Sequence, residues 1–90
     1  MSNIQVPDAW STVIGDATVV EVEATTVLDA LVLLTNRFPV LRVRVFSKPG
    51  VVASWLNVAV DGAILSRQDI PHTPLTANQT VLVVPAIAGG

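Results

Sequence analysis

The sequence predicts an α+β protein in which one main helix packs across one face of a mixed β-sheet. Apolar segments with period-two alternation lie toward both ends of the chain, and a single segment between them has helical periodicity. The chain has 90 residues, of which 51% are hydrophobic and 13% are charged. This composition supports one domain with one densely packed core.

The chain opens with two predicted strands that form a hairpin. Ile4 and Val6 alternate with polar residues, and Pro7 ends this first strand. Residues 8–15 are interpreted as a loop. Alternation returns over residues 17–24, where Thr18, Val20, Val22 and Ala24 share one face. Glu21 and Glu23 then point to water.

A change of period after the second strand predicts the helix. Thr26 can cap its start, and Asp29 three residues later approximates a capping box. The expected buried stripe consists of four apolar residues at helical spacing: Val27, Leu31, Leu34 and Phe38. Pro39 stops the helix. Val32 and Leu33 fall toward the outer side, where we expect the following loop to cover them, with contact to a partner as the alternative.

Residues 40–54 carry a weaker pattern. A short strand is predicted here, because two arginines alternate with three apolar residues: Leu41, Val43 and Val45. Arg42 and Arg44 are interpreted as a solvated face. A turn is predicted over residues 47–50, which contain a Pro-Gly pair.

The alternation typical of a strand resumes at Trp55 and continues to residue 60. Asp61-Gly62 is a specific signal for a two-residue hairpin turn, so the returning strand should begin at residue 63. Residues 68–79 are expected to form a loop or short helical turn that carries Leu75 into the core.

The last strand, residues 80–84, is the most continuously apolar one. This character predicts a central position in the sheet with both faces buried.

Composition and charge exclude several classes of function. The net charge is −2 and no lysine or arginine precedes Arg37, which disfavours nucleic-acid binding. The chain has no cysteine, which removes disulfides, thiolate nucleophiles and cysteine metal sites. Neither a signal peptide nor an apolar run of about 20 residues is found, so a cytoplasmic protein is expected.

The sequence offers no catalytic constellation. His72 stands alone between two prolines, and without cysteine or tyrosine there is no nucleophile–base pair. We therefore predict no catalytic residue, no metal site and an exposed loop histidine. No glycine-rich phosphate loop occurs, so no cofactor is expected to bind this chain.

The chain ends in a narrow apolar segment after Pro85. Gly89 and Gly90 lack a Cβ, so the backbone there is thin and conformationally free. Fully extended, the residues beyond Pro85 reach roughly 17 Å. We expect residues 1–85 to form the folded domain and residues 86–90 a flexible tail that presents the Gly90 carboxylate to a partner. A frayed terminus without function is the alternative.

This order of elements and the Gly-Gly ending resemble the ubiquitin-like β-grasp fold and, more narrowly, the ThiS/MoaD family of sulfur carriers. The segments that carry the resemblance are Trp55-Leu56-Asn57-Val58-Ala59-Val60-Asp61-Gly62, Leu75, and Thr80-Val81-Leu82-Val83-Val84-Pro85-Ala86-Ile87-Ala88-Gly89-Gly90. The loop ahead of Trp55 is similar to that of the longer carriers of the cysteine-biosynthesis type.

Two positions depart from the family pattern. Ala77-Asn78-Gln79 stands where the family commonly has an acidic Asp-Gly-Asp turn, and the acidic hairpin is reduced to Asp61. Asparagine tolerates the left-handed conformation, so the turn should form without those carboxylates.

The resemblance implies that the chain is a protein co-substrate and not an enzyme. A partner similar to ubiquitin-activating enzymes would use ATP to adenylate the Gly90 carboxylate, and a sulfur donor would convert it to a thiocarboxylate. A downstream synthase would then accept the sulfur for cysteine, a cofactor or a sulfur-containing natural product. The partners would recognise the tail through Pro85, Ala86, Ile87, Ala88 and Gly89.

Three alternatives remain open. The chain could be a ubiquitin-like modifier conjugated through Gly90, although its tail lacks the arginines of ubiquitin-type tails. It could be the small subunit of a molybdopterin-synthase-like complex, which an exposed patch of Val32, Leu33 or Trp55 would indicate. It could also be a β-grasp binding module whose tail has no role.

Overall fold

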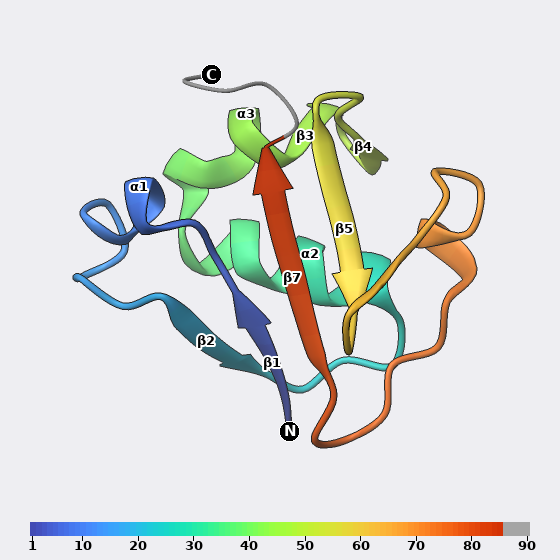
Figure 1. The fold of residues 1–90 in the computed structure, drawn as a ribbon. Coiled ribbons are helices and arrows are strands. Elements are labelled where there is room, and N and C mark those ends of the chain that lie inside the picture. Colours follow the sequence, from blue (N-terminus) through green and yellow to red (C-terminus); the bar gives the residue numbers. More distant parts are fainter. Residues whose placement is uncertain (86–90) are drawn as a thin grey trace.

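The computed structural model describes residues 1–85, and it confirms the predicted α+β architecture (Figure 1). A five-stranded mixed sheet has the order β2-β1-β7-β5-β6. Its strands are β1 (Ser2–Gln5), β2 (Val19–Val22), β5 (Leu56–Val60), β6 (Ala63–Ile64) and β7 (Thr80–Pro85). A separate two-stranded sheet pairs β3 (Phe46–Lys48) with β4 (Val51–Val52).

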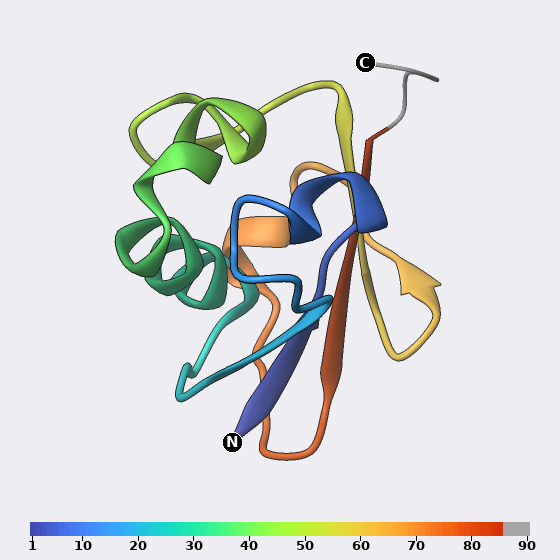
Figure 2. The same cartoon turned by 90° about the vertical axis from the view of Figure 1, so that its left-hand side faces the viewer.

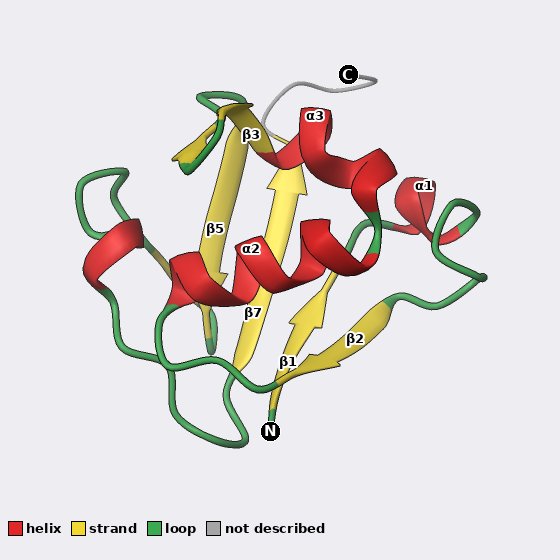
Figure 3. Ribbon diagram, turned by 180° about the vertical axis from the view of Figure 1, so that it is seen from behind, coloured by secondary structure: helices red, strands yellow, loops and turns green. Residues whose placement is uncertain are grey.

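The main helix, α2, covers one face of the large sheet (Figure 3). The helical elements are α1 (Asp8–Ser11), α2 (Val27–Arg37), α3 (Arg42–Val45) and the 3-10 turns η1 (Pro39–Leu41) and η2 (Ile70–His72). Seen along the sheet, α2 and α3 lie on one side and β6 on the other (Figure 2). The core therefore forms between α2 and a single face of the sheet.

The ends of α2 follow from local chemistry. Thr26 Oγ1 accepts a hydrogen bond from the Asp29 N–H at 3.0 Å, which confirms the predicted cap. Leu31 and Leu34, on the core-facing side of the helix, are completely buried. Phe38 follows the last helical residue with φ −126° and is only partly buried, so the buried stripe ends one turn earlier than expected.

The two outer apolar residues of α2 have different neighbours. Both Val32 and Leu33 are partly buried against the core. Val32 lines a groove with residues of the 46–50 segment, as expected, whereas Leu33 lies beside β2 and Arg37. The two residues therefore form no shared exposed patch.

The prediction of a strand over residues 41–46 was wrong, because residues 39–45 form the helical turns η1 and α3 and only Phe46 belongs to a strand, β3. Leu41 and Val45 are four residues apart and both are fully buried, whereas Val43 between them is 76% exposed. A strand would place all three side chains on one face, but one helical turn places only the first and last there. The 8–15 loop also contains a helical turn, α1, which buries Trp10.

The turns around the last two strands agree with the sequence. Asp61 and Gly62 have φ values of 48° and 89°, and they join β5 to β6 as a two-residue hairpin. Asn78 adopts φ 71°, so the turn before β7 forms with asparagine in the left-handed region. Leu75 is buried, as predicted.

Strand β7 lies at the centre of the sheet, as predicted, but only one of its faces is covered. It pairs in parallel with β1 and antiparallel with β5. Val81 and Val83 are fully buried, whereas Leu82 is partly buried and Val84 is 43% exposed. The expectation of burial on both faces was wrong, because α2 packs on the Val81/Val83 side alone.

Candidate functional site

The C-terminal end of β7 is where the structure places the first predicted site residue. Pro85 is half-buried and pairs with Leu56 at the start of β5. We call this pair, Pro85 and Leu56, the tail root. The other predicted tail residues, Ala86, Ile87, Ala88, Gly89 and Gly90, lie outside the described residues.

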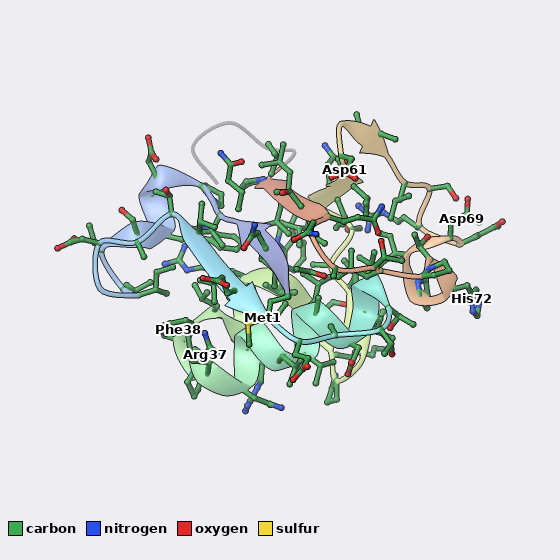
Figure 4. All side chains as sticks on the ribbon, turned by 90° about the horizontal axis from the view of Figure 1, so that it is seen from below. Met1, Arg37, Phe38, Asp61, Asp69 and His72 are labelled. Atoms are coloured by element: carbon green, nitrogen blue, oxygen red, sulfur yellow. The ribbon has the colours of Figure 1, made fainter. Side chains whose placement is uncertain are left out.

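The other end of β7 is clamped by the β5–β6 turn. Asp61 Oδ1 accepts a hydrogen bond from the Thr80 N–H at 3.0 Å, and the Asp61 N–H donates to the Thr80 carbonyl at 3.0 Å. Asp61 Oδ2 accepts from Gln79 Nε2 at 3.3 Å. Figure 4 shows Asp61 beside these strands. The remaining acidic residue of this hairpin thus positions β7 within the sheet.

Arg67 holds the start of β5, a role that the sequence reasoning missed. Its guanidinium donates to the carbonyls of Ala53, Ser54 and Leu56 at 2.7, 2.6 and 2.8 Å. Strand β6 pairs only with the last two residues of β5, so the first residues have no strand beside them on that side. Arg67 supplies donors there, and it thereby fixes the Leu56 half of the tail root.

The sheet face opposite α2 carries an apolar hollow next to the tail root. The strand register places Leu82 beside Ala59 and Ala59 beside Ile64, while Val84 lies beside Asn57. These side chains line a hollow of about 290 Å³. Ile64 is 75% exposed and Val84 is 43% exposed. We call this surface, Asn57, Ala59, Ile64, Leu82 and Val84, the open face.

The open face was also missed from the sequence, although one signal was present. Asn57 alternates with the buried residues Leu56 and Val58, which places a polar side chain on the face opposite the core. Because Asn57 pairs with Val84, the outward face of β7 must be accessible as well. Continuous apolar character in β7 therefore reflects an exposed apolar surface rather than burial on both sides.

The described residues include a single histidine. His72 lies in η2, exposed at the rim of the molecule near Asp69 (Figure 4). Within residues 1–85 no three histidine, aspartate or glutamate side chains come together as metal ligands. Among the same residues, no helix combines the length and apolar character needed to cross a bilayer.

The five-stranded mixed sheet and its one main helix define a class of protein, the ubiquitin-like β-grasp proteins. A family model described as the ThiS family matches residues 4–90. The chain therefore belongs to the ThiS family, whose sulfur carriers are non-catalytic substrates of partner enzymes.

Solved structures of other proteins confirm the fold. A chain in the crystal structure of the Amycolatopsis orientalis BexX/CysO complex superposes with a TM-score of 0.85 at 22% identity, covering 100% of both chains. SAMP1 from Haloferax volcanii superposes with a TM-score of 0.80 at 25% identity, covering 99% of this chain and 98% of the other. Mycobacterium tuberculosis CysO superposes with a TM-score of 0.83 at 17% identity, covering 97% of this chain and 100% of the other. A comparison with curated protein sequences found no match.

Proposed function

We propose that the chain is a sulfur carrier whose Gly90 carboxylate is adenylated by a partner enzyme and converted to a thiocarboxylate. The observation that supports this most is the family match, which continues through the Gly-Gly ending to residue 90. The described body complements it, because the central strand of the sheet leads directly into these residues at the tail root. The Gly90 carboxylate attacks the α-phosphate of ATP, which the partner binds, and pyrophosphate leaves. Sulfur from the donor then displaces AMP from the activated acyl carbon.

The open face is the surface on which we expect the activating enzyme to dock. It lies beside the tail root, and its exposed apolar side chains, Ile64 and Val84, bury area when a partner covers them. An enzyme that encloses residues 86–90 must also contact the body at this point. A CysO protein of this fold has been crystallised as a complex with BexX, so stable protein association occurs among similar structures.

Activation can be tested with the adenylating enzyme of the same organism. We expect ATP–pyrophosphate exchange that depends on this chain and disappears when Gly89 and Gly90 are removed. With a sulfur donor added, intact mass spectrometry should show one oxygen replaced by sulfur at the C-terminus. Exchange that persists without the two glycines would contradict the proposal.

The docking surface can be tested independently of the tail. Val84→Ser should raise the KM of the activating enzyme for the carrier several-fold, by the loss of apolar contact worth about 1 kcal/mol. The matched control is Val13→Ser, since Val13 is 40% exposed but lies outside the open face. Equal KM values for the two variants would contradict docking of the activating enzyme on the open face.

Protein conjugation through Gly90 is the second candidate. It is favoured by the likeness to two structures of SAMP1 from Haloferax volcanii, which is named a small archaeal modifier protein. Mass spectrometry of protein isolated from the host distinguishes the two. Isopeptide-linked adducts on lysines select the modifier, and a terminal thiocarboxylate without adducts selects the carrier.

A further inference from the structure

Positive charge is concentrated in one segment of this acidic protein. Apart from Arg67, every lysine and arginine lies between residues 37 and 48, and no acidic residue occurs between Asp29 and Asp61. Arg37 donates to the Glu21 carbonyl and lies beside β2, away from the others. Three exposed cations therefore remain together on and after α3: Arg42, Arg44 and Lys48.

The single turn of α3 arranges two of these cations around an apolar tip. Successive residues of a helix are rotated by about 100°. Val45 points into the core, so Val43 points outward and is 76% exposed, with Arg42 and Arg44 on either side. An apolar tip flanked by two positive charges suits contact with an apolar depression bordered by carboxylates.

This surface is connected to the tail root. The Trp55 indole N–H donates to the Arg44 carbonyl at 3.3 Å, and Trp55 directly precedes Leu56, the strand partner of Pro85. Trp55 is 37% exposed, which extends the apolar contact. In Figures 1 and 3, α3 lies at the same end of the molecule as the end of β7. We call these residues, Arg42, Val43, Arg44 and Trp55, the α3 face.

A groove of about 250 Å³ adjoins Arg42. Its walls include Val32, Phe46 and Pro49, and none of its lining residues is acidic. The guanidinium at the edge of an apolar groove provides a place for one carboxylate side chain of a partner, because Arg presents paired donors that match a carboxylate.

We propose that the α3 face docks onto an acidic surface of the enzyme that activates Gly90, with Val43 seated in an apolar depression between carboxylates. This inference rests on the proposed function and adds the chemistry of the partner surface. The open face and the α3 face lie on opposite sides of the sheet, so together they bracket the tail root (Figure 2). The apolar face contributes contact area, while the cationic face orients the carrier during approach.

A protein partner fits these observations better than a nucleic acid or a membrane. The net charge is −2, and binding to either polyanion depends on many neutralised charges. Only three cations are grouped here, and the most exposed residue of the face is an aliphatic one. Such a composition is typical of a small interface with charged residues around an apolar contact.

The test uses ATP–pyrophosphate exchange by the activating enzyme at increasing concentrations of the full-length carrier. Arg42→Gln/Arg44→Gln should raise the KM for the carrier about tenfold with kcat unchanged, since two charge-assisted contacts are lost. The KM of the original carrier should rise with salt concentration, and that of the variant should rise much less. Val43→Ser should raise the KM while leaving the salt dependence intact.

The matched control is Thr25→Glu/Gln68→Glu, which makes the chain more negative by the same amount at two exposed positions outside the α3 face. Equal KM values or equal salt dependence for the two double variants would overturn the inference. So would tighter binding of the carrier to a single-stranded RNA or to phosphatidylglycerol vesicles than to the enzyme. Failure of the proposed function is distinct, because the unsubstituted chain would then support no exchange.

Discussion

Single polar residues fix the frame of the sheet in this protein. Asp61 occupies a left-handed turn position and binds the start of β7 through both its backbone and its side chain. Arg67 binds three carbonyls at the start of β5. Each residue makes hydrogen bonds that a neighbouring strand would otherwise supply. Asp61 holds the end of β7 that is far from the tail root, and Arg67 holds the end of β5 that lies at the tail root.

At this scale we predict that Asp61→Ala lowers the free energy of unfolding by about 1–3 kcal/mol. Alanine removes the acceptor for the Thr80 N–H and disfavours the positive φ of this position. Asp61→Asn keeps an oxygen acceptor and tolerates the left-handed region, so it should lose at most about 1 kcal/mol. Urea denaturation of the two variants measures the difference, and equal losses would contradict the roles given to the acceptor oxygen and to the left-handed backbone conformation.

At the scale of elements, the side chains of β7 alternate between the core and the open face. Val81 and Val83 fill the core beneath α2, while Leu82 and Val84 belong to the open face. Because neighbouring side chains of a strand point to opposite faces, one element both supports the fold and exposes apolar surface at the tail root.

The two faces of β7 should respond differently to the same truncation. Val83→Ala should cost about 2 kcal/mol or more, through lost burial and a cavity in the core. Val84→Ala, at the next position, should stay within about 0.5 kcal/mol because this side chain is already exposed. Thermal unfolding of both variants provides the comparison. A similar loss at the two positions would mean that the open face is covered in solution.

The helix cap of α2 provides a second prediction for this scale. Thr26→Ala should destabilise the fold by about 0.5–2 kcal/mol, because the Asp29 N–H loses its acceptor. Thr26→Ser retains a hydroxyl and should remain close to the original midpoint of unfolding. An Ala variant as stable as the Ser variant would show that solvent satisfies this N–H equally well.

Local chemistry explains which elements were predictable. The Asp61-Gly62 hairpin, the Thr26 cap and the Asn78 turn each depend on one or two residues with specific backbone preferences, and all three were confirmed. The helix at 42–45 was not predictable from its pattern, since apolar residues at every second position also fit a helical turn that leaves Val43 outside. The exposure of Leu82 and Val84 depends on which sheet face α2 covers, and that is a tertiary property.

For the site, the sequence indicated Pro85 and the residues that follow it. Pro85 lies at the end of β7, and the role of all six residues stays a prediction. The two flanking surfaces were not predicted. Arg42 and Arg44 are exposed, as expected for a solvated face. Their relation to Pro85 depends on the contact between Trp55 and α3, which links residues 11 positions apart in sequence. Such non-local contacts leave no pattern in a single sequence.

At the scale of the whole molecule, we expect folding to be separable from presentation of the tail. The core, the sheet and the clamps at Asp61 and Arg67 that the structure describes are made by residues 1–85. We therefore predict that deletion of residues 86–90 leaves the midpoint of thermal unfolding unchanged within about 2 °C, because it removes no described core contact. The same deletion should abolish chain-dependent ATP–pyrophosphate exchange. A loss of stability as large as that of Val83→Ala would contradict this separation.

The parallel pairing of β1 with β7 has a consequence for synthesis of the chain. Without β7, the sheet falls into two disconnected pairs, β2-β1 and β5-β6, so a nascent chain has no complete core until its final strand is available. A product that ends before β7 would lack the buried residues Val81 and Val83 and the strand that joins the two pairs. Under the proposed function, such a product would offer the activating enzyme neither a complete fold nor the Gly90 carboxylate.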